Sequence, residues 1–202
     1  MLRLSVMFFL DDIKMASTAK LNRRSFLGFA LSSALMCLAP SRAWSALGNI
    51  PIPARSLSLY NPNTKESINV VYWEEGNYVS QALAEINHIM RDRLTGQTKP
   101  MDANLLDLLF AISTTLEIQR PLHIISGYRT PKTNALLRKR GKPAAKNSYH
   151  LQGKAVDIRV PGYRLSALRQ VSTKLRGGGV GYYPRSRFLH VDVGPIRYWS
   201  GR

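Results

Sequence analysis

The sequence predicts an α+β domain in which a small, mainly antiparallel sheet has its helices packed on one side. Two stretches, "KAVDIRV" at 154–160 and "FLHVDV" at 188–193, alternate between apolar and other residues, as strands with one buried face do. Two earlier stretches, 83–94 and 105–116, carry apolar residues at helical spacing. With 45% hydrophobic residues, the 202-residue chain can bury the core of one domain of catalytic size and still include a leader.

Residues 1–45 are interpreted as an N-terminal leader with a signal peptide. An apolar run of 14 residues at 26–39 follows several basic residues, and it is too short for a typical spanning helix. The order Arg-Arg-Ser-Phe-Leu at 23–27 resembles a twin-arginine export signal, so we expect a periplasmic protein with no stable membrane span after cleavage. The first 14 residues fit an export signal poorly, which suggests that translation starts at Met15.

Cysteine content and charge exclude several classes of function. Cys37 is the only cysteine and lies in the leader, so thiolate nucleophiles, iron-sulfur clusters and cysteine zinc knuckles are excluded from the exported part. Six of the 29 basic and two of the 12 acidic residues precede Ala46, which leaves a formal charge of about +13 after it. Outside the cytoplasm, the expected polyanion is the cell wall, anionic lipid or lipopolysaccharide and not nucleic acid. The "RKRGK" cluster at 138–142 is equally well explained as a solvated helix end.

The first elements of the domain follow a linker. Residues 46–56 contain prolines and precede the domain at 57–202. "SLSLYNPNTKESINVVYW" at 56–73 predicts two short strands that form a hairpin around the turn at 61–63.

Two core helices are predicted after the hairpin. The first runs over 83–94 and is closed by Gly96, and the second follows Asp102, which is a good N-cap. His88 lies on the polar side of the first helix, so we expect it to face solvent.

A strand and a helix are predicted next, with a charged residue at their junction. "LHIISGY" at 122–128 is typical of a strand, and 130–141 of a helix with Thr130 as its N-cap. Arg129 lies between them, where binding groups are often placed, although a surface ion pair is the alternative. His123 is expected to be an interior histidine bonded to backbone, with contact to the substrate as the alternative. The remaining elements are a helix at 165–175 and short strands within 177–199.

Three ligand-type side chains lie at strands or their edges. Asp157 and His190 each lie opposite the apolar face of an alternating stretch, and His150 lies in the loop before the first of them. Two imidazoles and one carboxylate, with one position left open, are the pattern of catalytic zinc. Scattered structural residues are the alternative, because the pattern alone does not establish convergence.

The motifs that contain these residues resemble those of a known superfamily. "SYHLQGKAVDI" at 148–158 is similar to Ser-x-His-x-x-Gly-x-Ala-x-Asp, the zinc motif of the D-alanyl-D-alanine carboxypeptidase, VanX-type dipeptidase and Hedgehog-like superfamily. "SGYRT" at 126–130 and "FLHVDVG" at 188–194 match two further motifs in the correct order. With "GGVGYYP" and the terminal "RYW", the chain resembles the murein endopeptidase K branch over roughly residues 52–200.

The resemblance implies a fold like that of the superfamily and a Zn²⁺ ion held by His150, Asp157 and His190. In that mechanism zinc acidifies the attacking water and polarises the peptide carbonyl. Arg129 is expected to stabilise the developing oxyanion, and Ser148 and Tyr128 are expected to contact the substrate.

The general base departs from the wider superfamily. Many members carry Glu three residues before the last ligand, or another His nearby, but Arg187 occupies that place here and cannot accept a proton. Asp192 is the nearest carboxylate on the ligand face and is therefore predicted as the base. The competing interpretation is that Asp192 accepts a hydrogen bond from a ligand histidine and fixes its tautomer.

The function implied is that of an exported zinc metallopeptidase that hydrolyses peptide cross-links of peptidoglycan. The alternatives are a D,D-carboxypeptidase or dipeptidase acting on murein stems, and a non-catalytic, zinc-containing module that binds cell wall. The sequence does not indicate which bond is cut or the oligomeric state. Tyr182, Tyr183 and Trp199 are candidates for lining the cleft, with aromatic core packing as the alternative.

Overall fold

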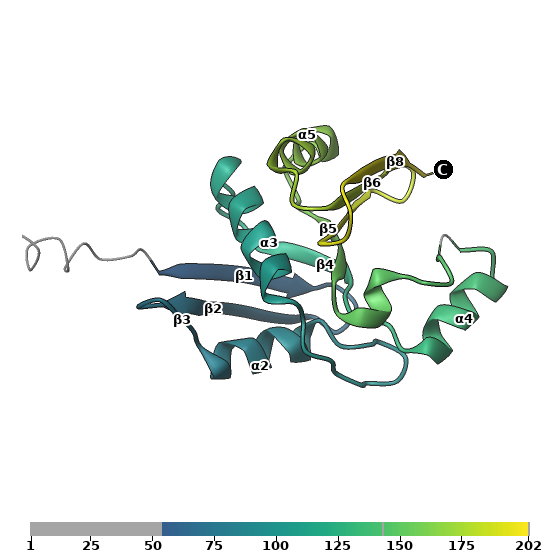
Figure 1. The fold of residues 1–202 in the computed structure, drawn as a ribbon, viewed down its shortest axis with the longest axis horizontal. Helices are drawn as coiled ribbons and strands as arrows, with labels where there is room; N and C mark the ends of the chain where they lie inside the picture. Colours follow the sequence, from purple (N-terminus) through teal and green to yellow (C-terminus); the bar gives the residue numbers. More distant parts are fainter. Residues whose placement is uncertain (1–53, 143, 202) are drawn as a thin grey trace, which may run out of the picture. The chain divides into compact units, whose positions relative to one another are not determined.

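The computed structural model describes residues 54–142 and 144–201 and shows the predicted α+β fold (Figure 1). The predicted leader at 1–45, the start at Met15 and most of the linker lie outside these residues. The strands are β1 (Arg55–Asn61), β2 (Glu66–Glu74), β3 (Asn77–Tyr78), β4 (Leu122–Ser126), β5 (Ala155–Arg159), β6 (Gly179–Tyr183), β7 (Phe188–Asp192) and β8 (Arg197–Ser200). The helices are α2 (Ser80–Ile89), α3 (Ala103–Thr115), α4 (Pro131–Lys139), α5 (Leu165–Leu175) and the short 3-10 helix η1 (Tyr149–Gln152).

The strands form one sheet in the order β3-β2-β1-β4-β5-β7-β6-β8. Strand β1 pairs in parallel with β4, and β6 with β8, whereas every other neighbouring pair is antiparallel. The prediction of a mainly antiparallel sheet is therefore confirmed. Strand β5 lies between β4 and β7, so the two alternating stretches identified in the sequence are direct neighbours in the sheet. The other edge of β5 pairs with β4, where Ser126 lies opposite Asp157.

The core lies between one face of the sheet and helices α2, α3 and α5. In the β5–β7 register Val156 lies opposite Val191, and Ile158 opposite Leu189, so all four project from the same face. Each is fully buried, and burial of such a side chain contributes about 1.5–3 kcal/mol. The alternate residues of both strands consequently project from the other face, where the candidate site lies.

The predicted hairpin is present as β1 and β2. Its turn is fixed by Asn61, whose side-chain oxygen accepts a hydrogen bond from the Asn63 amide at 3.0 Å. The Asn61 carbonyl accepts another from the amide of Lys65 at 2.8 Å. Strand β3, which pairs with the end of β2, was not predicted.

The caps predicted for two helices are observed. The Asp102 side chain accepts from the Asn104 amide at the start of α3, and the Thr130 hydroxyl accepts from the Thr133 amide at the start of α4. Helix α5 has the predicted bounds, Leu165–Leu175.

The prediction for α2 was wrong at its C-terminal end, because the helix stops at Ile89 and does not continue to Leu94. After the end of the helix, the Asp92 carboxylate accepts hydrogen bonds from the backbone amides of Leu94 and Thr95. Leu94 is 52% exposed and is not a core residue. His88 in the last turn is largely exposed, as predicted.

No helix within residues 54–142 and 144–201 combines the length and the apolar character that a membrane span requires.

Candidate metal centre

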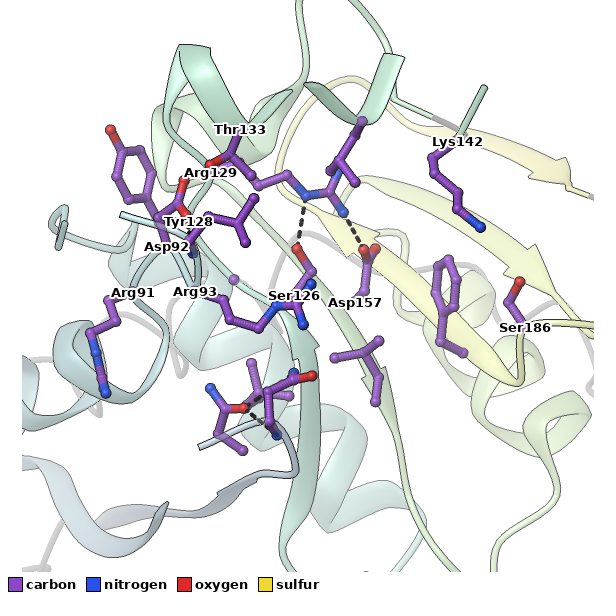
Figure 2. A pocket seen from close by; sticks show the side chains of 18 residues that line it. Arg91, Asp92, Arg93, Ser126, Tyr128, Arg129, Thr133, Lys142, Asp157 and Ser186 are labelled. Atoms are coloured by element: carbon purple, nitrogen blue, oxygen red, sulfur yellow. Dashed lines mark hydrogen bonds and ion pairs between the residues drawn. The ribbon is translucent and has the colours of Figure 1, made fainter. Parts of the chain in front are cut away.

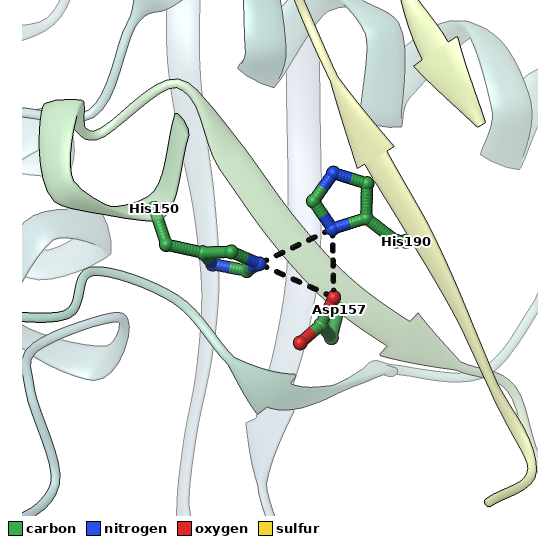
Figure 3. Close-up of side chains that lie close together, drawn as sticks. All are labelled: His150, Asp157 and His190. Atoms are coloured by element: carbon green, nitrogen blue, oxygen red, sulfur yellow. Dashed lines mark hydrogen bonds and ion pairs between the residues drawn. The ribbon is translucent and has the colours of Figure 1, made fainter. Parts of the chain in front are cut away.

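Three side chains from separate segments converge on the face of the sheet opposite the core. The ligand-type atoms of His150, Asp157 and His190 lie within 4.8 Å of one another, and all three residues are buried. Asp157 Oδ1 is 2.9 Å from His190 Nδ1 and 3.3 Å from His150 Nε2, and the two ring nitrogens are 3.2 Å apart. Figure 3 shows both imidazoles directed at the carboxylate.

The sheet register positions two of these residues. Asp157 in β5 lies directly opposite His190 in β7, and both point away from the core because their neighbours Val156 and Val191 point into it.

The third residue, His150, is positioned by η1. The Ser148 hydroxyl caps this helix by accepting from the His150 amide at 3.3 Å. Gly153 ends it in the left-handed region with φ 70°, and a side chain there would collide with the backbone of Pro100. The glycine of the motif is thus required both by its φ and by a close backbone approach.

Hydrogen bonds on the outer side fix which ring nitrogen of each histidine faces the centre. His150 Nδ1 lies 2.7 Å from the Gly127 carbonyl and donates to it, so Nε2 of the neutral ring carries the lone pair. His190 Nε2 donates to Asp192 Oδ2 at 2.8 Å, which leaves its Nδ1 as the acceptor. Two ring nitrogens and a carboxylate oxygen therefore turn lone pairs toward one point, and this nitrogen and oxygen donor set suits a divalent cation.

The electrostatics of Asp157 and His150 match this arrangement. Burial would raise the pKa of Asp157, but His150, His190 and Arg129 outweigh it and hold the pKa well below its usual range. Burial also lowers the pKa of His150, which keeps that ring neutral at pH 7. The centre therefore contains an ionised carboxylate and a neutral imidazole, both of which are competent metal ligands. Burial would lower the pKa of His190, but the neighbouring carboxylates of Asp157 and Asp192 outweigh it and raise the pKa, so a metal at the centre has to displace a proton from that ring.

Asp192 is fully buried behind His190 and is surrounded by donors. Its Oδ2 accepts from His190 and from Arg197 Nη2 at 2.7 Å, and its Oδ1 accepts from the Gly179 and Gly194 amides. Burial would raise its pKa, but these hydrogen bonds lower the pKa to about 2. Asp192 does not line the cavity at the metal centre.

Arg129 contacts the centre from the other side. Its Nη2 donates to Asp157 Oδ2 at 2.5 Å and its Nε to the Ser126 hydroxyl at 2.8 Å (Figure 2). The guanidinium is buried, so the alternative of a surface ion pair is excluded. Arg129 reaches the centre through Asp157.

A cavity of about 550 Å³ opens at the three residues and has an aromatic wall. Tyr183 and Trp199 line it, as the sequence suggested, and Trp199 Nε1 donates to the Tyr183 hydroxyl at 2.9 Å. Tyr182 does not line it, because its ring packs near the guanidinium of Arg169 on the other side of β6. Ser148 also lines this cavity.

Comparison with known proteins identifies the family. A sequence model of the family described as peptidoglycan L,D-endopeptidase MepK matches residues 51–199. The chain belongs to this family. A peptidoglycan L,D-endopeptidase MepK from Escherichia coli strain K12 is 41% identical over 181 residues, which cover 88% of this chain and 97% of that protein. A relative from Haemophilus influenzae, named "Probable peptidoglycan L,D-endopeptidase MepK", is 40% identical over 157 residues, which cover 77% of this chain and 84% of that protein.

The range that matches the MepK family contains all three ligand-type residues together with Arg129 and Asp192. The resemblance to the murein endopeptidase K branch is thereby confirmed. Arg187, which occupies the position of the superfamily Glu, is exposed in the turn between β6 and β7 with φ 54° and does not line the cavity.

Sequence reasoning missed Arg197 in this MepK family member. Its guanidinium binds Asp192 and lies 5.1 Å from the ring centroids of both Tyr149 and Trp199. Arg197 belongs to the terminal "RYW" stretch, but that stretch does not indicate its contact with Asp192, which depends on the pairing of β8 with β6.

Two other predicted residues lie away from the cavity at the three ligands. Tyr128 lines a neighbouring cavity, with the Lys99 amine 5.8 Å from its ring centroid. His123 packs against the ring of Tyr60, and its Nδ1 has no hydrogen-bond partner among the described residues. The prediction that backbone would bind the His123 ring was therefore wrong at this nitrogen.

Proposed function

We propose that this chain is an exported, zinc-dependent endopeptidase that hydrolyses peptide cross-links of peptidoglycan. The observation that carries the proposal is the convergence of His150, Asp157 and His190 at an open cavity, with each ring oriented by a hydrogen bond on its outer side. The names of the relatives add the bond type, since they are L,D-endopeptidases of peptidoglycan.

The metal of the proposal is Zn²⁺, with His150, Asp157 and His190 as its ligands. Zinc accepts two imidazole nitrogens and a carboxylate oxygen and leaves a fourth position open in catalytic sites. The chemistry that zinc supplies when bound is Lewis acidity toward a peptide carbonyl and toward water.

Arg129 has two roles in the proposal. Its bonds to Asp157 and Ser126 hold the carboxylate in place, as a partner outside the ligand set does for a metal ligand. Its Nη1 makes no hydrogen bond to the described residues and Arg129 lines the cavity, so this nitrogen is free to donate to negative charge that develops on the substrate oxygen.

Of the two roles considered for Asp192 from the sequence, general base or orientation of a ligand histidine, we assign it the second. Its carboxylate oxygens are occupied by donors from His190, Arg197 and two backbone amides, and it is separated from the cavity by the His190 ring. A general base must lie within hydrogen-bond reach of the proton that it removes. The contacts therefore support a carboxylate that fixes the tautomer and the orientation of His190.

Export rests on the leader motif at 23–27. In a cell fractionation experiment, replacing both Arg23 and Arg24 with Lys is expected to leave the protein in the cytoplasm. A periplasmic double variant would refute the twin-arginine route.

The enzymatic proposal is tested by incubating the purified protein with peptidoglycan sacculi, digesting the glycan with a muramidase and identifying the resulting muropeptides by mass. Endopeptidase activity converts cross-linked muropeptides into monomers with intact stems, and a chelator abolishes this conversion. Loss of a terminal residue alone would indicate a carboxypeptidase. Binding to sacculi with no change in the muropeptides would indicate a non-catalytic cell-wall module.

A further inference from the structure

A second cavity of about 250 Å³ adjoins the metal centre. It shares Arg129, Asp157 and Phe188 with the cavity at the three ligands, so the two hollows meet at the Arg129–Asp157 ion pair. Nothing in the proposed chemistry uses this second cavity. A side chain of the substrate that extends from the reacting bond toward this side would enter the second cavity directly.

Two cations in this cavity have no acidic partner among the described residues. Arg93 and Lys142 line it, and neither forms a salt bridge within residues 54–142 and 144–201. In Figure 2 the Arg93 side chain extends toward Ser126, and Lys142 lies on the other side of Asp157. The two cations therefore border the cavity from opposite sides.

The acidic residues in the same cavity are already bound. Asp92 accepts from the amides of Thr130 at 2.6 Å and Leu94 at 2.8 Å, and Asp157 is paired with Arg129 and belongs to the metal centre. Because these carboxylates are engaged by other donors, Arg93 and Lys142 give the cavity an excess of positive charge. Such an excess favours an anionic group on the ligand.

Apolar side chains form part of the remaining wall. Leu94, Ile125, Leu137 and Phe188 line the cavity together with uncharged polar residues such as Asn61, Asn63 and Ser126. A cavity of this kind accommodates an aliphatic chain that ends in a charged group, because the stem is removed from water while the charge is paired.

We propose that this cavity binds a free carboxylate of the peptide stem, held by Arg93 and Lys142, while the cross-link lies at the metal centre. The inference rests on the proposed function and deepens it by assigning a substrate group to a second site. In a cross-link between two diaminopimelate residues, each partner has an aliphatic chain and a carboxylate that is not part of the bond. The cavity combines the two features that would recognise such an arm.

The test uses a soluble dimer of two stem peptides joined through diaminopimelate, prepared with free side-chain carboxylates and with these carboxylates amidated. KM and kcat are measured for the wild type and for the double variant Arg93→Gln, Lys142→Gln. The matched control is Lys139→Gln, Arg140→Gln, which removes the same two charge types from exposed positions that do not line the cavity.

Amidation is expected to raise KM of the wild type on the order of 10-fold with little change in kcat, since two partly exposed charge pairs are lost. The cavity variant should show the same rise with the carboxylate peptide and no longer distinguish the two peptides. The control variant should distinguish them as the wild type does.

Equal KM values for the two peptides with the wild type would overturn the inference, as would full discrimination by the cavity variant. A wild type that cleaves neither peptide at any zinc concentration would refute the proposed function itself. The two failures are therefore distinguishable.

Discussion

Replacing Asp192 with Asn tests how the metal centre is built, because the change replaces one carboxylate oxygen with an NH₂ group and keeps the shape of the side chain. In the wild type, Oδ2 of Asp192 accepts from His190 and Arg197, while Oδ1 accepts from the amides of Gly179 and Gly194. An Asn oxygen can keep the two amide bonds, but its NH₂ group then faces two donors. Each charged hydrogen bond that is lost is worth about 1.5–3 kcal/mol, and less for the partly exposed Arg197.

The lost bond to His190 acts on the metal through the tautomer of the ring. To accept from an Asn NH₂ group, His190 must expose a lone pair at Nε2 and carry its proton on Nδ1, the atom that faces Asp157. We therefore expect Asp192→Asn to weaken zinc binding on the order of 10- to 100-fold, with much of the cleavage rate restored by excess zinc.

The assay measures zinc affinity by competition with a chelating dye and cleavage of the soluble cross-linked dimer across a zinc titration. The control is Asp107→Asn, because Asp107 also accepts from three side chains but lies in α3, outside the metal centre. It should lose stability and keep its zinc affinity. Normal zinc affinity in Asp192→Asn with a loss of about 10²- to 10⁴-fold in turnover would refute the orienting role and restore Asp192 as the general base.

Three further predictions concern the ligands, the acid stability and the turn of the motif. Alanine at any one of the three ligand positions, in His150→Ala, Asp157→Ala or His190→Ala, should abolish cleavage and tight zinc binding as measured by elemental analysis. Each variant should still unfold cooperatively in urea, because the core lies on the other face of the sheet. Full zinc content in a variant would remove that residue from the ligand set. Burial would raise the pKa of Asp107, but hydrogen bonds from its partners lower that pKa in the folded protein. The ionised carboxylate therefore stabilises the fold fully above the pKa of the unfolded chain, ~3.9, and this stabilisation is lost as the pH falls through the pKa of the folded state. The urea midpoint of Asp107→Asn should therefore lie below that of the wild type at pH 7, and the gap should narrow at pH 3; a gap that is independent of pH would contradict this. Gly153→Ala should destabilise the protein by more than about 1 kcal/mol in urea unfolding, because of its positive φ and the close backbone, and an unchanged midpoint would show that η1 adapts.

Local sequence pattern was sufficient to place two of the three ligand-type residues on one face. Alternation in β5 and β7 put Asp157 and His190 opposite the apolar side chains, and antiparallel pairing made them direct neighbours. Alternation could not place His150, because the sequence of η1 is typical of a loop. Only the motif that contains Gly153 indicated that His150 lies near Asp157 of β5.

The contacts that the sequence did not predict depend on the tertiary fold. Arg197 is only five residues from Asp192 in the chain, and it contacts that carboxylate because β8 turns back to pair with β6 at the edge of the sheet. Helix α2 ends early because Asp92 turns to bind the amide of Thr130, which is 38 residues away. Apolar spacing gives no sign of such a bond, so the pattern extended the helix too far.

The most direct test of the account is a zinc titration of chelator-stripped protein with the cross-linked dimer as substrate. If His150, Asp157 and His190 hold the one zinc ion on which cleavage depends, the rate should rise from zero, increase in proportion to added zinc and reach a plateau at one equivalent per chain. Cleavage by the stripped protein in the presence of chelator, or no cleavage at any zinc level, would contradict the account.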